Sequence, residues 1–374
     1  MISAALLVAM GIAAISPLRD YQRAASLLLR MEDAEGSGGF ARLGTYPVDE
    51  SITRVLTSDG PVHARLFVPR GKESPPGLVL LHGVHYLGID EPRLVKFAHA
   101  FAQSGVTVLT PQLDDLAAYQ IMPRSIDVIG ASAHLLRQRT GKTVGVMGLS
   151  FAGGLALLAA ADHRYSPDIS MIVAVGAHDS LYRVAKFLVT GVAQSPNGRV
   201  ATLQPEQYGA LVLVYEHPAE FFSANDVPAA RECLRLWLAE KYDAARLGEA
   251  GLSANDKSVV EALFRYNMKA LRQQLLAEIE HDRADFDAVS PQGRLTDLHV
   301  PVFLLHGASD AVIPSTETQW LAHEIPAATP EVVLITPAMG HVDPNLHLGI
   351  RQRWQLINFM AKVFERLGAE SSSR

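Results

Sequence analysis

Three polar residues, Ser150, Asp310 and His341, could together carry out nucleophilic acyl chemistry. The serine stands in the segment GLSFAGG, the aspartate ends the segment LLHGASD, and the histidine ends the segment LITPAMGH. A serine hydroxyl has too high a pKa to attack a carbonyl unaided, so it needs a histidine as base. The histidine in turn needs an acid to orient it. The three residue types are therefore sufficient for such a site if the fold brings them together.

The sequence around Ser150 suits a nucleophile. A nucleophilic serine must lie on a sharp turn with strained dihedral angles, so the residues two positions away on either side must be small. Here they are Gly148 and Ala152. A helix that starts after Ser150 would also direct N–H groups and its positive dipole end toward an oxyanion. The alternative is a glycine-rich corner between a strand and a helix, with no chemistry.

Strand and helix patterns alternate along the chain from Gly77 onward. Continuous apolar runs such as GLVLLHG, VTVLTPQ and MIVAVGAH are typical of buried parallel strands. The segments between them have helical spacing, and the Asp59-Gly60 pair before them predicts a hairpin. Repeated units of this kind predict an α/β fold, an open and mostly parallel sheet with helices on both faces. Polar residues that follow such strands lie at the edge where these sheets build their sites.

A long interruption divides this pattern. Residues 180–297 read as mostly helical, and a connection of that length is an inserted domain and not a loop. We therefore assign residues 51–179 and 298–374 to the α/β core and residues 180–297 to a helical cap. We expect residues 1–18 to form an apolar N-terminal helix and residues 19–50 to form a helix and a linker.

Composition excludes several classes of function. Hydrophobic residues make up 48% of the 374 residues and charged residues 19%, which suits a large buried core and not a disordered chain. The net charge is −6 and no basic tract stands out, so nucleic acid is not expected as a partner. The single cysteine, Cys233, cannot form an internal disulfide. No pair of histidines has ligand spacing with a third nearby, so we predict no metal and no cofactor.

The N-terminal segment leaves two interpretations open. Residues 2–18 carry no charge, and their length is at the short end of the range of about 17–25 residues that spans a membrane. As an anchor, the segment would hold the main domain on the cytoplasmic side, because Arg19 and Arg23 follow it. As a helix packed on the protein itself, it would leave a soluble cytoplasmic protein. A cleaved signal is less favoured, since no Lys or Arg precedes the apolar run.

The order Ser150, Asp310, His341, with each residue at a strand end, resembles the α/β-hydrolase fold superfamily, in particular its serine esterase- and lipase-like members with a helical cap. The resemblance extends from about residue 51 to residue 368. It implies that Ser150 is the nucleophile, that His341 is the general base and then the general acid, and that Asp310 orients the histidine.

The segment LLHGVH matches the His-Gly loop that follows an early strand in this superfamily. The match implies an oxyanion hole made by the backbone N–H groups of Phe151 and Val84, with His85 as an alternative second donor. Gly83 belongs to the same loop. We interpret His82 as a structural residue that braces this loop, and not as a base.

One position departs from the commonest pattern of the superfamily, and one position offers an alternative acid. The usual turn is Gly-x-Ser-x-Gly, and this chain has Ala152 at the fifth position, which we expect to fit because alanine is the next smallest residue. Asp179 is an alternative acid, since some members carry the acid after that strand. We favour Asp310 because Gly-x-x-Asp after the penultimate strand is the commoner arrangement.

These residues predict a serine hydrolase that cleaves a carboxylic ester or a thioester through an acyl-enzyme on Ser150. The cap carries aromatic residues such as Trp237 and Phe264, so we expect a small-molecule acyl substrate with an apolar group. An acyltransferase or an amidase could use the same three residues. A binding protein of the same fold without catalysis is the alternative of another class. The sequence does not indicate an oligomeric state.

Overall fold

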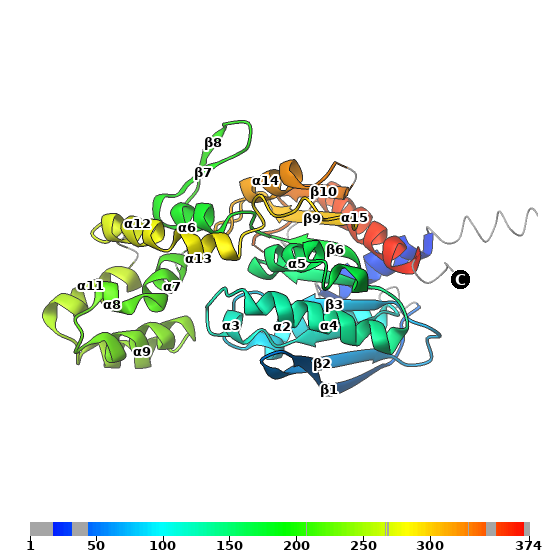
Figure 1. Cartoon of the computed structure of the whole chain (residues 1–374), viewed down its shortest axis with the longest axis horizontal. Coiled ribbons are helices and arrows are strands. Elements are labelled where there is room, and N and C mark those ends of the chain that lie inside the picture. Colours follow the sequence, from blue (N-terminus) through cyan, green and yellow to red (C-terminus); the bar gives the residue numbers. More distant parts are fainter. Residues whose placement is uncertain are drawn as a thin grey trace, which may run out of the picture.

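The computed structural model describes residues 18–31, 44–206, 208–265, 267, 269–327, 329–341 and 349–369. Within these residues an eight-stranded sheet has the strand order β1-β2-β4-β3-β5-β6-β9-β10 (Figure 1). The strands of this sheet are β1 (Val48–Thr57), β2 (Gly60–Pro69), β3 (Gly77–Leu81), β4 (Thr107–Pro111), β5 (Val144–Leu149), β6 (Ile169–Val175), β9 (Val302–Gly307) and β10 (Pro330–Thr336).

The sheet is parallel from β4 to β10 and antiparallel at its other edge. Strand β2 pairs antiparallel with both β1 and β4, and the remaining neighbours pair parallel. The predicted hairpin joins β1 to β2, with Thr57 opposite Gly60 and Gly60 at φ +116°. Because the central strands are parallel, their carboxyl ends meet at one edge of the sheet.

Helices cover both faces of the sheet, as the sequence predicts. Alternate residues of β3 point to opposite faces: Leu78 and Leu80 belong to one apolar cluster, and Val79 and Leu81 belong to the other. The first cluster includes residues of helix 18–31, α2 (Pro92–Gln103) and α15 (Ile350–Ala369). The second includes residues of α4 (Arg124–Thr140), α5 (Phe151–Ala161) and α14 (Thr316–Glu324). Three short helical turns lie in the connections: η1 (Gly88–Asp90), α3 (Asp114–Ala117) and η2 (Ser166–Asp168).

Helix 18–31 packs on the core. Tyr21 stacks on Trp354 of α15 with ring centroids 5.4 Å apart, and its hydroxyl donates to Asn358 Oδ1. Arg30 donates to the carbonyl of Ala100 in α2 at 3.0 Å. The anchor prediction rests on residues 2–18, of which residues 2–17 lie outside the described part of the chain. None of the helices that the structure describes is apolar over a length that could cross a membrane.

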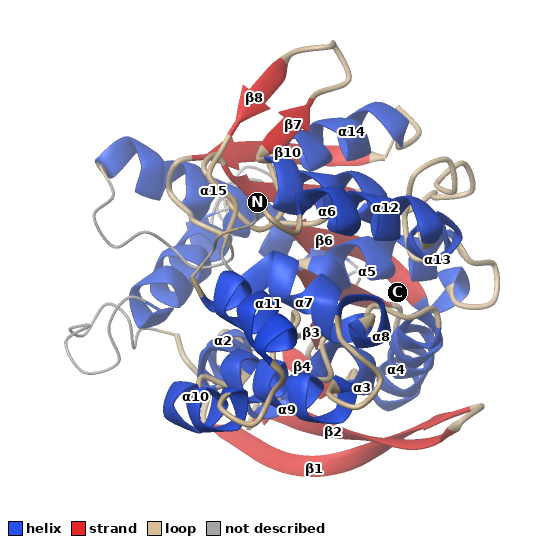
Figure 2. Ribbon diagram, turned by 90° about the vertical axis from the view of Figure 1, so that its left-hand side faces the viewer, coloured by secondary structure: helices blue, strands red, loops and turns tan. Residues whose placement is uncertain are grey.

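The chain between β6 and β9 is mainly helical. Its elements are α6 (Leu181–Thr190), β7 (Val192–Gln194), β8 (Val200–Thr202), α7 (Tyr208–Glu216), α8 (Pro218–Phe221), α9 (Val227–Leu238), α10 (Tyr242–Glu249), α11 (Ala254–Phe264), α12 (Arg272–His281) and α13 (Arg283–Ala288). The predicted cap limits, 180 and 297, fall just before α6 and in the connection from α13 to β9. Figure 2 shows α7, α8, α9 and α11 in front of β3 and β4, so this segment lies over one edge of the sheet.

Candidate active site

Ser150 lies on a strained turn between β5 and α5. Its φ of +58° and ψ of −134° are unusual for a residue with a side chain, and such a conformation costs about 1–3 kcal/mol. The turn is fixed because the N–H of Ser150 donates to the carbonyl of Val175 at the end of β6, at 2.8 Å. This bond to β6 holds Ser150 in the strained turn, with its hydroxyl at the carboxyl edge of the sheet.

The small residues around Ser150 are required by close backbone contacts. A Cβ on Gly148 would lie 2.5 Å from the carbonyl oxygen of Ala152. A Cβ on Gly153 would lie 2.7 Å from the Cβ of Ala177, so this glycine lets α5 approach the chain after β6. Ala152 itself is fully buried. The alanine that departs from the commonest pattern thus has room at its position.

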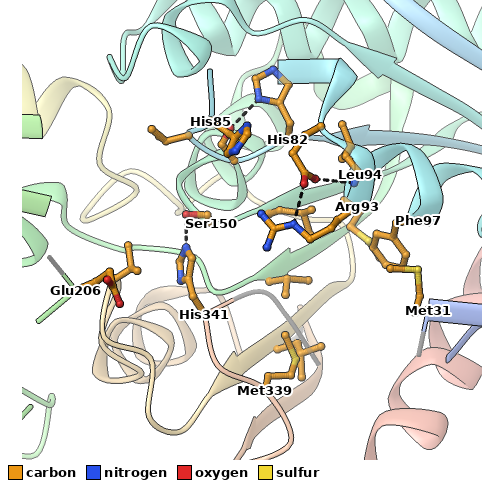
Figure 3. Close-up of a pocket in the computed structure, with 18 of the residues that line it drawn as sticks. Met31, His82, His85, Arg93, Leu94, Phe97, Ser150, Glu206, Met339 and His341 are labelled. Atoms are coloured by element: carbon orange, nitrogen blue, oxygen red, sulfur yellow. Dashed lines mark hydrogen bonds and ion pairs between the residues drawn. The ribbon is translucent and has the colours of Figure 1, made fainter. Parts of the chain in front are cut away.

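A chain of hydrogen bonds joins the three residues that the sequence singled out. Ser150 Oγ lies 2.7 Å from Nε2 of His341, and Nδ1 of His341 lies 2.6 Å from Oδ2 of Asp310 (Figure 3 shows the first bond). With the proton on Nδ1, the histidine donates to the aspartate and accepts from the serine. The three side chains come from segments that follow β5, β9 and β10.

Asp310 is fully buried and well supplied with donors. Its Oδ1 accepts from the N–H groups of Val312 at 2.8 Å and Ile313 at 3.0 Å. Its Oδ2 faces both His341 and His306, and His306 Nε2 lies 3.2 Å away. Burial alone raises the pKa of Asp310, but the hydrogen bonds from the two histidines outweigh it and lower the pKa to about 2. The carboxylate is therefore ionised at neutral pH.

Asp179 has different partners. Its carboxylate accepts from Nη2 of Arg183 at 2.6 Å, and its own N–H donates to Oε2 of Glu317 at 3.0 Å. Burial raises the pKa of Asp179 to about 7, although the hydrogen bond from Arg183 opposes the rise. His341 is thus bonded to Asp310 and not to the alternative acid, Asp179. Asp179 instead contacts Arg183 of α6 and Glu317 of α14.

The loop after β3 lies against Ser150. A Cβ on Gly83 would be 3.1 Å from the Cβ of Ser150, a tight contact, so glycine lets the loop come this close without displacing the serine. His82 braces the loop: Nδ1 donates to the carbonyl of Gly83 at 2.7 Å, and Nε2 accepts from the N–H of Leu113 at 2.9 Å. Burial lowers the pKa of His82 to about 4, so the ring is neutral at physiological pH. Val84 follows in this loop.

No protein-family model matches the sequence, and neither does any curated protein. Solved structures that resemble the chain include the acylaminoacyl peptidase of Pyrococcus horikoshii, with 12% identity and a TM-score of 0.50 over 88% of this chain and 42% of that one. They also include a puromycin-hydrolyzing peptidase of Mycobacterium tuberculosis, with 13% identity and a TM-score of 0.50 over 88% and 40%. The chain has the α/β-hydrolase fold. It spans about two fifths of either peptidase, and the likeness is one of fold.

An esterase of Pyrobaculum calidifontis is similar over nearly its whole length. It has 15% identity and a TM-score of 0.48, over 93% of this chain and 92% of that one.

A cavity of about 770 Å³ opens on Ser150 and His341 in this α/β-hydrolase fold (Figure 3). Most of its walls are apolar, and they come from distant parts of the chain. The apolar residues on its core side include Leu27, Leu28, Met31, Leu94, Phe97, Met339, Leu356 and Met360. Trp237, Leu238 and Tyr242 line it from α9 and α10 of the helical insertion. The site is thus a large apolar chamber with the serine and the histidine in its wall.

Sequence reasoning missed two contributors to this chamber. Helix 18–31 supplies Leu27, Leu28 and Met31, although the sequence placed it outside the core. Tyr119 was also missed. It has a φ of +64°, and its hydroxyl donates to the carbonyl of Leu238 at 2.6 Å, which joins the core to the insertion. The apolar spacing of residues 24–31 was a signal for the helix, whereas nothing in the sequence marks Tyr119.

One group of side chains could present ligand atoms to a metal ion in the part of the chain that is described. His217, Glu278 and Asp282 each offer an atom within 4.8 Å of the others. The group lies in the insertion and includes neither Ser150 nor His341. The expectation of a reaction without a metal or cofactor stays a prediction.

Proposed function

We propose that this protein is a serine hydrolase that cleaves a carboxylic ester or a thioester through an acyl-enzyme on Ser150. The observation that carries the proposal is the hydrogen-bonded chain from Asp310 through His341 to the strained Ser150, which opens on an apolar cavity. A buried structural serine has no need of a strained backbone, a histidine and an ionised carboxylate together.

The reaction follows from the protons that these atoms can exchange. Ser150 Oγ attacks the carbonyl carbon while His341 Nε2 takes the hydroxyl proton, and Asp310 stabilises the resulting imidazolium. The negative charge moves to the carbonyl oxygen, where the N–H groups of Phe151 and Val84 would donate to it. His341 then gives the proton to the leaving alcohol or thiol, and the bond to the leaving group breaks. Water, deprotonated by His341, releases the acid and restores the serine.

The N–H of Phe151 is a suitable oxyanion donor because of its position. Phe151 is the first residue of α5, and the first N–H groups of a helix have no acceptor within their own helix. The positive end of the helix dipole adds to the attraction for a negative oxygen. Val84 lies in the loop that Gly83 brings against Ser150. Both donors would thus face the same side of the hydroxyl.

Labelling with a fluorophosphonate probe tests the proposal. The probe reacts with an activated serine, so the wild-type protein should become labelled and Ser150→Ala should not. Loss of labelling in His341→Ala, with an unchanged circular dichroism spectrum, would show that the serine depends on the histidine. A wild-type protein that takes up no probe would refute the hydrolase proposal, and equal labelling of Ser150→Ala would refute Ser150 as the nucleophile.

A further inference from the structure

A second cavity of about 320 Å³ lies beside the one that contains Ser150. Val84, Tyr119, Tyr208 and Val312 line both cavities, so the two share a wall. Phe151 also lines the second cavity. The second cavity therefore begins at the two residues whose N–H groups we assign to the oxyanion.

The two ends of this cavity differ in chemistry. Its middle is apolar and is formed by residues of α6, α7 and α13: Leu181, Ala185, Leu188, Val212, Leu213 and Phe286. Helix α7 runs from Tyr208, in the wall that the two cavities share, to Glu216. The titratable residues in the wall of the second cavity are Glu216, His217, Asp282 and Asp285. Three of the four are acids, and no lysine or arginine is among the described residues that line the cavity. A group that fills this cavity meets an apolar passage and then a cluster of carboxyl groups.

The carboxyl groups at this end are short of cations. His217 is within ion-pair distance of Glu278 at 3.4 Å and of Asp282 at 3.1 Å, so one imidazole faces two acids. The contact between Nε2 of His217 and Oδ2 of Asp282 lacks hydrogen-bond geometry, so this enclosed oxygen accepts no hydrogen bond from the described residues. Glu216 is partly buried and has no hydrogen bond or ion pair among the described residues. An unpaired acid in an apolar wall is costly unless a ligand pairs with it.

The position of His341 decides which half of the substrate enters the second cavity. A leaving group must lie next to His341 to receive its proton, and His341 lines the larger cavity only. The acyl carbon is bonded to Ser150, to the oxyanion, to the leaving group and to the rest of the acyl part. With the leaving group in the larger cavity beside His341, the second cavity is the space left for the acyl part. The two cavities adjoin at Val84, Tyr119, Tyr208 and Val312.

We propose that the second cavity binds an acyl part that is apolar near the carbonyl and ends in a cationic group, such as a protonated amine, which pairs with Glu216 and Asp282. This inference rests on the proposed function and adds the class of substrate. The larger cavity then receives the leaving group.

Matched pairs of p-nitrophenyl esters test the proposal. In each pair the leaving group is the same and the acyl parts have equal numbers of heavy atoms: 6-aminohexanoyl against heptanoyl, and 8-aminooctanoyl against nonanoyl. We measure kcat/KM at pH 7 with EDTA present, for the wild type, Glu216→Gln and Asp243→Asn. Asp243 is exposed on α10 and lines neither cavity, so Asp243→Asn removes one negative charge of the insertion elsewhere.

The wild type should prefer the amino ester of at least one pair by about tenfold or more, which corresponds to about 1.4 kcal/mol. Glu216→Gln should lower that ratio by about tenfold and raise kcat/KM for the alkyl ester, whereas Asp243→Asn should keep the wild-type ratio. A wild type that hydrolyses every alkyl ester faster than its amino partner would overturn the inference. A ratio of amino-ester to alkyl-ester kcat/KM that is the same in Glu216→Gln as in the wild type would also overturn it.

Two measurements separate the possible failures. Reaction with the fluorophosphonate probe, without any preference for amino esters, would reject the cationic acyl part and leave the hydrolase proposal standing. Failure to react with the probe would reject both. Glu216→Gln removes an unpaired acid, so its melting temperature should equal or exceed that of the wild type. Melting at wild-type temperature with a changed ratio assigns the effect to recognition and not to misfolding.

Discussion

Replacement of Asp310 by asparagine changes the direction of one hydrogen bond in the site. Oδ1 of Asp310 accepts from two backbone N–H groups, so the amide oxygen of the asparagine must take that place. The amide nitrogen then faces His341 as a donor. His341 would accept on Nδ1 and carry its proton on Nε2, the atom that must accept the proton of Ser150. The wrong tautomer should therefore stop the serine from being activated.

The expected loss of activity is large and the loss of stability is moderate. The same replacement in the triad of a serine protease lowers kcat by about 10⁴, so we expect about 10³–10⁴ here, or about 4–5.5 kcal/mol. The pKa of Asp310 is about 2 instead of 3.8. This difference corresponds to about 2 kcal/mol of unfolding free energy. Because the folded state has the lower pKa, that stabilisation is present above pH of about 4 and is lost as the pH falls toward 2.

Steady-state hydrolysis of p-nitrophenyl esters measures the first effect, and urea unfolding at pH 7 measures the second. Asp179→Asn is the matched control, because Asp179 is also a buried aspartate after a strand but is bonded to Arg183. It should stay within about tenfold of wild-type kcat. If Asp310→Asn remained within tenfold while Asp179→Asn lost about a thousandfold, the assignment of the acid would be wrong.

Three further outcomes follow from contacts in the structure. Gly148→Ala should abolish activity or folding, because its Cβ would lie 2.5 Å from the carbonyl oxygen of Ala152. Ala152→Gly should keep activity within about threefold. Expression and ester hydrolysis of both variants check this pair. His178 is fully buried after β6, and burial lowers its pKa to about 4. Between pH 6.5 and 4 the unfolded chain therefore binds a proton that the folded chain does not, so the free energy of unfolding falls as the pH is lowered through that window. In His178→Gln the unfolding free energy should depend less on pH there, by about 1.4 kcal/mol per unit, and an unchanged slope would contradict the pKa. Leu28→Trp should fill part of the larger cavity and so lower kcat/KM for esters of bulky alcohols, while the rate of fluorophosphonate labelling stays unchanged. An equal loss for small and bulky alcohols would contradict the assignment of this cavity to the leaving group.

The core of the fold could be predicted because its signals are local. Buried parallel strands are continuous apolar runs, and the residues that follow them must reach the same edge of the sheet. For this reason Ser150, Asp310 and His341 could be proposed together from the sequence. The choice between Asp310 and Asp179 depended on a spatial fact, namely which of them accepts from Nδ1 of His341.

The helical insertion was less predictable in detail. The apolar spacing runs on from residue 227 to residue 248, yet the structure has two helices there, α9 and α10. The break lies at Glu240, which has a φ of +60°. The backbone N–H of Lys241 then donates to the carbonyl of Leu236 at 2.9 Å. Glycine is usual at such a helix end, so a glutamate gave no sign of the break. Packing between helices, and not local preference, decides where α9 ends.

Cavities were beyond the reach of sequence reasoning for a related reason. Leu28, Met31 and Glu216 are ordinary helix residues by spacing, and their roles depend on which side chains of other elements face them. A cavity is formed by the absence of packing between distant segments, which a local pattern does not record.

Rapid quenching of the reaction with a p-nitrophenyl ester, followed by mass spectrometry of the peptide that contains Ser150, tests the central claim most directly. We predict a burst of p-nitrophenol and an acyl group on Ser150, which decays with the steady-state rate. The burst and the acylated peptide should both be absent in Ser150→Ala. Turnover of the ester with no acylated serine, or with the acyl group on another residue, would contradict the account.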